Sequence, residues 1–217
     1  MDEMQLIERE SMFPTWVLYA LLVAVGILAL VKLWRPVIFQ YITATFVKPP
    51  STIPYSRENL SFFGRASWML LLNYFVVAGI SISMVSTYYG FQQDLLIFVP
   101  TFYFLFQAIS LFMAGGVSGE LKKLNEHFLL LNFTYHTLGL LLIPLLLIWL
   151  LNVNYSIYFI YTLAILFSFF WLLRVVRGIF FALRNNILWY YIILYLCTLE
   201  IWPLVAFYVL LIADFKR

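Results

Sequence analysis

Residues 128–151 read FLLLNFTYHTLGLLLIPLLLIWLL, and this stretch is the clearest guide to the fold. It carries no Asp, Glu, Lys or Arg over its whole length. A helix needs about 20 mostly apolar residues to cross a bilayer core of roughly 30 Å. The stretch therefore predicts a transmembrane helix.

Five other stretches are also long and mostly apolar. The predicted spans cover residues 15–33, 66–89, 95–114, 128–151, 155–173 and 187–213. The whole chain is 65% hydrophobic and 11% charged, against about 25% charged in soluble domains. The sequence predicts an all-α, polytopic membrane bundle of six helices that forms a single domain over residues 1–217. The short turn NVNY at 152–155 predicts that spans four and five are antiparallel neighbours.

Two connecting segments differ from simple turns. Residues 36–47 are apolar but too short to span, and KPPSTIPYSREN follows them with three prolines. We expect an interfacial helix and then an extended segment. Residues 178–186 form a second short segment that we expect at the interface. The residues before span one lack a basic region and a cleavage site, so span one is expected to be retained.

Basic residues predict the orientation of the chain. The connections after spans one, three and five, together with Lys32 at the end of span one, hold ten of the 13 Lys and Arg residues, and the remaining three are Arg9, Lys216 and Arg217. The positive-inside rule then puts these connections in the cytoplasm and both termini outside it. The net charge of +3 is too small to indicate nucleic-acid binding.

Polar residues inside spans are costly and usually face the bundle interior, so they are the candidates for a site. The candidates within spans are Asn73, Gln107, Ser110, Asn132, Thr134, His136, Cys197, Thr198 and Glu200. On a rise of 1.5 Å per residue, Asn73, Gln107 and His136 lie roughly 10–12 Å from the cytoplasmic span ends. Glu200 lies at roughly 20 Å, near the midplane. These groups are predicted to line a cavity open to the cytoplasm, with Glu200 at its floor.

A structural role is the alternative for most of these polar groups. Interhelical hydrogen bonds between such side chains are worth about 0.6 kcal/mol each on average. Gly79 and Ser83, four residues apart, favour close helix packing over ligand binding.

Glu200 raises a sharper question, because an isolated carboxylate at mid-bilayer costs about 2.5–3.5 kcal/mol on insertion scales. It must therefore be protonated or paired. Pro203 should kink its helix. Candidate partners are His136, Arg174 and Arg177, and depth favours His136. A proton-coupled or headgroup site and a purely structural acid remain equally open.

The histidines give little support to a metal site. His127 and His136 are nine residues apart on one predicted helix, which places them on opposite faces about 13 Å apart. The chain has one cysteine and no HExxH motif. We expect no metal and no cofactor, with a haem on His136 as a minor alternative. Catalytic motifs such as GxSxG and the P-loop are also missing, so an enzymatic activity is neither predicted nor excluded.

Three arginines follow span five: Arg174, Arg177 and Arg184. The simplest interpretation is that they set the orientation and meet anionic lipid. The alternative is that they clamp a phosphate headgroup, together with Asn185 and Asn186.

The stretch YLCTLEIWP at 195–203 resembles the terminal helix of a multi-pass membrane family of Bacteroidota (domain of unknown function 4271). HTLGLLLIPLLL at 136–147 and the segment 174–184 agree with it more loosely. The resemblance covers most of the chain after span one and implies a bacterial inner membrane, but it brings no activity.

The sequence thus predicts an integral membrane protein whose intramembrane polar site centres on Glu200. Our first hypothesis is a small transport or permeation element, or a subunit of an envelope assembly. The alternatives are a membrane-embedded enzyme acting on a lipid or polyprenyl headgroup, and a purely structural partner subunit. The expected partners are the lipid bilayer, anionic headgroups, and a membrane-protein partner or a second copy of the chain.

Overall fold

The computed structural model describes residues 13–40, 42, 64–90, 94–118 and 121–184, and every regular element in these ranges is helical. The long helices are α1 (Trp16–Trp34), α4 (Arg65–Tyr88), α5 (Val99–Ser118), α6 (Leu121–Leu151) and α7 (Ser156–Arg184). Two short 3₁₀ turns, η2 (Asp94–Phe98) and η3 (Val153–Tyr155), precede α5 and α7. The predicted all-helical class is confirmed for this part of the chain.

Five segments are long and apolar enough to cross a membrane: Trp16–Trp34, Arg65–Tyr88, Leu95–Met113, Leu131–Leu151 and Val153–Phe180. They correspond to the first five predicted spans. The predicted sixth span, 187–213, lies outside the described residues. The chain is a membrane protein by the length and composition of these helices.

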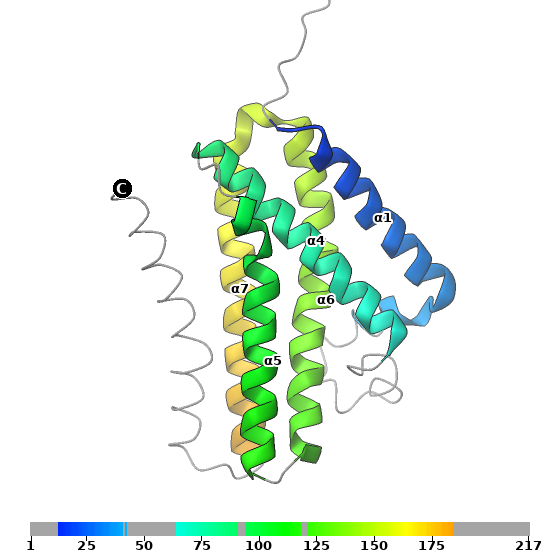
Figure 1. The fold of residues 1–217 in the computed structure, drawn as a ribbon, viewed down its shortest axis with the longest axis vertical. Helices are drawn as coiled ribbons and strands as arrows, with labels where there is room; N and C mark the ends of the chain where they lie inside the picture. Colours follow the sequence, from blue (N-terminus) through cyan, green and yellow to red (C-terminus); the bar gives the residue numbers. More distant parts are fainter. Residues whose placement is uncertain (1–12, 41, 43–63, 91–93, 119–120, 185–217) are drawn as a thin grey trace, which may run out of the picture.

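The helices form two groups (Figure 1). α5, α6 and α7 stand side by side, while α4 and α1 lean across them. α4 is the central element: it packs on α6 and α1, and η2 lies against it. α6 and α7 are antiparallel neighbours, as predicted from the short turn between them. The indole Nε1 of Trp149, which is fully buried, donates to Ser156 Oγ at 2.9 Å and fixes that turn.

The lower ends of α5, α6 and α7 reach further than α1 and α4 do (Figure 1). The helix that contains the predicted span five, 155–173, continues beyond that span to Arg184. Residues 178–184 of the predicted interfacial segment 178–186 are therefore the last turns of α7. Arginines mark where a helix leaves the hydrocarbon and not where it ends, since arginine is a good helix former.

Glycines allow two close approaches that shape the core. A Cβ on Gly139 of α6 would lie 3.0 Å from Tyr74 Cα of α4, so these helices meet almost backbone to backbone. A Cβ on Gly79 would lie 2.9 Å from the carbonyl oxygen of Ile97 in η2. The prediction of close packing at Gly79 is confirmed, although the partner is a 3₁₀ turn.

A second, smaller apolar cluster joins residues of α1, α4 and α6 with the segment after α1. Residues 37–40 are helical. Ile38 and Ile42 pack with Val31, Leu70 and Phe133, and all of these side chains are buried. The helix predicted from residue 36 onward is thus present in its described part, and its position at the membrane surface stays a prediction.

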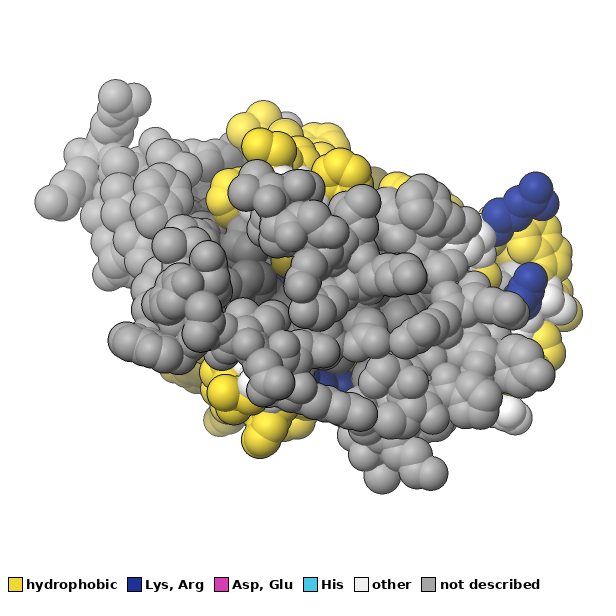
Figure 2. Space-filling view, turned by 90° about the horizontal axis from the view of Figure 1, so that it is seen from below, with side chains coloured by type: hydrophobic (Ala, Val, Ile, Leu, Met, Phe, Trp, Pro, Cys, Tyr) yellow, Lys and Arg dark blue, Asp and Glu magenta, His cyan; other side chains and the backbone are white. Residues whose placement is uncertain are grey.

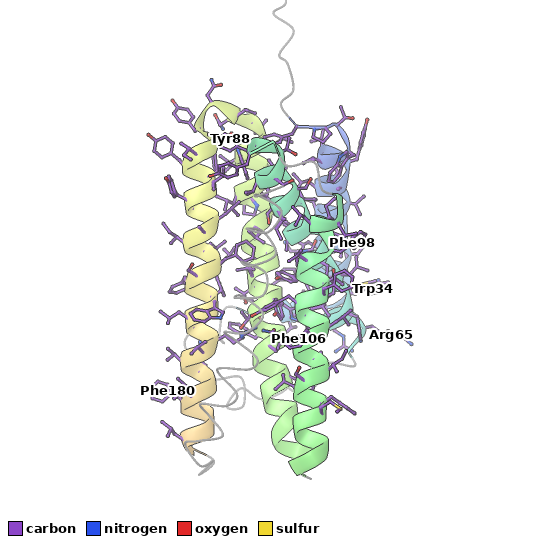
Figure 3. All side chains as sticks on the ribbon, turned by 60° about the vertical axis from the view of Figure 1, so that its left-hand side comes forward. Trp34, Arg65, Tyr88, Phe98, Phe106 and Phe180 are labelled. Carbon is purple, nitrogen blue, oxygen red and sulfur yellow. The ribbon has the colours of Figure 1, made fainter. Side chains whose placement is uncertain are left out.

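Most of the described outer surface is apolar. On α7, large exposed side chains recur every three or four residues and form one stripe: Ile165, Phe169, Leu172, Val176 and Phe180. Phe180 and Phe106 project outward from α7 and α5 (Figure 3). Seen from below, apolar side chains flank the molecule on two sides and lysine and arginine side chains stand at one edge (Figure 2). Such a surface suits lipid contact.

Candidate functional site

Four polar side chains from α5, α6 and α7 meet inside the bundle, and we call them the Arg174 cluster: Tyr103, Gln107, Tyr135 and Arg174. Arg174 Nη1 donates to Gln107 Oε1 at 2.8 Å and to the Tyr135 hydroxyl at 3.2 Å. Arg174 Nη2 donates to the Tyr103 hydroxyl at 3.3 Å. The Tyr135 hydroxyl in turn donates to Gln107 Oε1 at 2.5 Å. One guanidinium thus ties three helices together.

The helices hold these side chains in place by spacing and by aromatic packing. Tyr103 and Gln107 are four residues apart and share one face of α5. The ring of Tyr135 lies 4.7 Å from the ring of Tyr74 and 5.4 Å from that of Phe104. These contacts fix where the Tyr135 hydroxyl points.

The cluster is buried and rich in donors. Gln107 is 2% exposed, Tyr135 4% and Arg174 9%. Gln107 Oε1 accepts both short hydrogen bonds, and its amide Nε2 has no hydrogen-bond partner within the described part of the chain. A positive charge and a spare amide donor therefore lie side by side in a setting with little water. Such a group favours an anionic or acceptor-rich partner.

A second polar group joins α4 and α6, and consists of Ser67, Asn132 and His136. His136 Nε2 lies 3.0 Å from the Ser67 carbonyl oxygen and 3.4 Å from Ser67 Oγ. Asn132 Nδ2 donates to Ser67 Oγ at 3.5 Å. All three side chains are buried.

The geometry assigns the tautomer of His136. A carbonyl oxygen only accepts, so the proton of the ring must be on Nε2. Nε2 is then not available as a base toward the Ser67 hydroxyl, and the pair lacks the arrangement of a nucleophile and its base. His136 Nδ1 keeps its lone pair, for which the described residues offer no donor.

The predicted site residues divide between these two places. Gln107 and Arg174 belong to the Arg174 cluster, and Asn132 and His136 belong to the α4–α6 group. Asn73 is buried in α4, and its Oδ1 has no hydrogen-bond partner among the described residues.

The remaining predicted residues lie outside these two polar groups or outside the residues that the structure describes. The guanidinium of Arg177 stands 5.2 Å from the ring centre of Phe133. Arg184 is the last residue of α7. Cys197 and Glu200 lie outside the described residues, as do Asn185 and Asn186.

Sequence reasoning missed Ser67, Tyr103 and Tyr135. The chain has 15 tyrosines, and nothing in the sequence separates Tyr103 and Tyr135 from the others. Ser67 stands in the first turn of α4.

Metal binding finds no support in the described residues, among which no group of three His, Cys, Asp or Glu side chains comes together.

Comparison with known proteins gives one match. A family model described as "Domain of unknown function (DUF4271)" matches residues 17–211. No curated protein and no solved structure matches the chain. The resemblance to this domain family is confirmed, and the assignment of the family to Bacteroidota stays a prediction.

Proposed function

We propose that this chain, which belongs to the family described as "Domain of unknown function (DUF4271)", is a small transport or permeation element. In this proposal it recognises a phosphate-bearing anion at the Arg174 cluster. The observation that carries this proposal is the convergence of Arg174 and Gln107. A guanidinium offers a fork of donors that matches phosphate oxygens. The Gln107 amide, buried and without a hydrogen-bond partner among the described residues, adds a neutral donor beside it.

The depth of Arg174 supports a phosphate group as the ligand. Arg174 is 18 residues after Ser156, the first residue of α7. This distance along a helix is about 27 Å, close to the thickness of about 30 Å of the hydrocarbon core. With the α6–α7 turn at one boundary, Arg174 lies near the other, where lipid phosphates begin. Arg65 is the first residue of α4 and lies in the lower half of the molecule, level with Phe106 of α5 (Figure 3).

The orientation belongs to the same proposal. The end that carries Arg35 and Arg65 is the cytoplasmic one by the positive-inside rule, and both termini are extracytoplasmic. The membrane is the bacterial inner membrane. The ligand is then reached from the cytoplasmic leaflet, as a lipid headgroup or as a free phosphate compound.

Glu200 and Cys197 of the predicted sixth span complete the intramembrane site in this proposal. A carboxylate near the Arg174 cluster would compete with the anion for the guanidinium. Protonation of Glu200 would then favour anion binding, which couples the two events. Asn132 and His136 of the α4–α6 group, and Asn73 of α4, supply the remaining polar groups of this proposed site.

An envelope-assembly subunit is the second candidate, and the surface of α1 favours it. Only Val17, Leu21, Ala24 and Val31 of α1 are buried. The rest of the helix exposes large apolar side chains, including Tyr19 and Leu22. A partner protein or a second copy of the chain could cover them in place of lipid. The pairing of Ser67 with His136 does not support the enzymatic alternative, because His136 Nε2 carries the proton and cannot act as a base toward the Ser67 hydroxyl.

Native mass spectrometry of the protein in mild detergent tests the proposal. We expect a phosphate-bearing lipid to remain bound to the wild type and to be lost from Arg174→Gln. Arg65→Gln changes an exposed arginine at the start of α4, so it is the matched control and should keep the lipid. If the wild type releases lipid but binds added inorganic phosphate, the ligand is a free phosphate. Equal occupancy in wild type and Arg174→Gln, with either ligand, would contradict the proposal, and a stoichiometric protein partner would favour the assembly subunit.

A further inference from the structure

Two buried N–H donors stand close to Arg174, and neither has a hydrogen-bond partner within the described part of the chain. One is the amide Nε2 of Gln107 on α5, and the other is the indole Nε1 of Trp171 on α7. A buried donor that lacks an acceptor destabilises a fold, so each such group calls for an explanation. The proposed phosphate site accounts for the Gln107 amide but not for the Trp171 indole.

The Gln107 amide is held in one orientation. Its Oε1 accepts hydrogen bonds from Arg174 Nη1 and from the Tyr135 hydroxyl. The reversed amide would place its NH₂ group against the guanidinium, so Nε2 is directed away from it. Gln107 is 2% exposed. The amide therefore presents its N–H groups to a buried acceptor at the level of Arg174.

Trp171 lies beside Arg174 on α7, on the flank opposite to Arg177. Residues three positions before and three positions after Arg174 lie about one turn away, on the two faces that adjoin its own. The Arg177 guanidinium is 5.2 Å from the ring centre of Phe133 on α6. Arg174 itself reaches across to Tyr103 of α5. The Trp171 indole is thus on the side of Arg174 that is turned away from Phe133.

Trp171 also lies deeper in the membrane than Arg174. In the proposed function Arg174 is near the boundary at which lipid phosphates begin. Trp171 is three residues closer to the start of α7, which is about 4.5 Å along the helix. Its side chain is half-buried, and its Nε1 is buried. A ligand with its phosphate at Arg174 would pass Trp171 as it continues into the hydrocarbon.

An ester-linked glycerophospholipid carries a second acceptor at this distance from its phosphate. Five covalent bonds join the phosphorus atom to the carbonyl carbon of the ester on the central glycerol carbon, and five bonds span at most about 6 Å. The ester carbonyl only accepts and the indole N–H only donates, so the two are matched. A free phosphate ends before Trp171, and a polyprenyl phosphate continues as hydrocarbon without an acceptor.

We propose that the ligand of the Arg174 cluster is an ester-linked glycerophospholipid. Arg174 and Gln107 bind its phosphate, and Trp171 Nε1 donates a hydrogen bond to its ester carbonyl. The inference rests on the proposed function and narrows the ligand from any phosphate-bearing anion to one class of lipid. Beyond Trp171 the same side of α7 carries two small side chains, Ala164 and Ser168. An acyl chain that continues past Trp171 meets no large side chain at these two positions.

Short-chain lipids that differ only at the ester test this contact on the wild type. Microscale thermophoresis in detergent gives the dissociation constants of dioctanoyl phosphatidylglycerol and of its dialkyl ether analogue, which has the same headgroup but no carbonyl. We expect the ester lipid to bind about fivefold more tightly, as one neutral hydrogen bond would give. Equal dissociation constants would overturn this inference, and the proposed function would stand if Arg174→Gln abolished the binding of both lipids.

Trp171→Phe keeps an aromatic ring and removes the N–H. In this variant the ester lipid should bind no more tightly than the ether lipid, and the affinity for the ether lipid should match that of the wild type. Trp34→Phe, which changes an exposed tryptophan of α1, is the matched control and should keep the fivefold difference. A difference that persists in Trp171→Phe would contradict the proposal, because the ester contact would then lie elsewhere.

Farnesyl phosphate separates an effect on the ester from an effect on the phosphate. It has a phosphate and no ester, so the wild type and Trp171→Phe should bind it with equal affinity. Weaker binding by Trp171→Phe would show that the substitution acts on the phosphate, and would overturn the proposal. If Arg174→Gln binds farnesyl phosphate and both phosphatidylglycerols as the wild type does, the proposed function is wrong and this inference falls with it.

Discussion

Gly139→Ala tests the close contact between Gly139 of α6 and Tyr74 of α4, where these two helices cross. The added methyl group would lie 3.0 Å from Tyr74 Cα and 3.1 Å from Tyr74 Cβ, both well inside ordinary van der Waals distance. Neither atom is the free end of a flexible side chain, so the two helices must separate. Tyr74 packs on Tyr135, and the separation therefore disturbs the Arg174 cluster as well.

Two opposing effects set the magnitude. Extra volume in a packed core costs about 1–3 kcal/mol, whereas replacing glycine by alanine within a helix gains roughly 0.5–1 kcal/mol. We expect a net loss of about 1–2 kcal/mol in the free energy of unfolding. For a chain of this size, that lowers the melting temperature by about 2–8 °C.

Differential scanning fluorimetry in one detergent measures the effect, and the chain offers a matched control. A Cβ on Gly178 of α7 would have no atom within 4 Å. Gly178→Ala should therefore raise the melting temperature, by about 1–4 °C from helix propensity alone. A melting temperature for Gly139→Ala that rises as Gly178→Ala does would refute the close approach of α4 and α6.

Two further substitutions examine single contacts. Tyr135→Phe removes the hydroxyl that contacts both Gln107 and Arg174. We expect a loss of about 1 kcal/mol in the free energy of unfolding and a smaller rise of the melting temperature with phosphate compounds. An unchanged melting temperature would show that the hydroxyl does not contribute to stability. Gly79→Ala should lower the melting temperature as Gly139→Ala does, because its Cβ would meet the backbone oxygen of Ile97 at 2.9 Å. Cysteine labelling of Leu95 in this variant should be faster than in the wild type if η2 is displaced.

Hydrophobicity was enough to predict the class and five of the helices. The apolar runs are long, and the membrane imposes one solution on them, since each backbone group must find its hydrogen bond within the helix. The helix ends were less predictable. α7 passes through Arg174 and Arg177 to Arg184 without a break, because charges mark the membrane boundary but do not stop a helix.

The composition of the site was partly predictable, but its grouping was not. Gln107 and Arg174 were both candidates, yet they were assigned to different features, a cavity and an anion clamp. The structure brings them within 2.8 Å. Their meeting depends on how α5 and α7 rotate about their own axes, which spacing along one helix does not determine. Tyr135 was overlooked because its role lies in one hydroxyl group.

The most direct test of the central claim is the stabilisation of the purified protein by phosphate-bearing ligands. The melting temperature is measured with inorganic phosphate and with a short-chain phosphatidylglycerol, and diacylglycerol of equal chain length serves as the ligand without phosphate. At ten times the dissociation constant, binding contributes about 1.4 kcal/mol, or a rise of about 3–5 °C. We predict this rise for the wild type and Arg65→Gln with at least one of the two phosphate compounds, and its loss in Arg174→Gln. An equal rise in Arg174→Gln, or no rise in the wild type with either compound, would contradict an anion site at the Arg174 cluster.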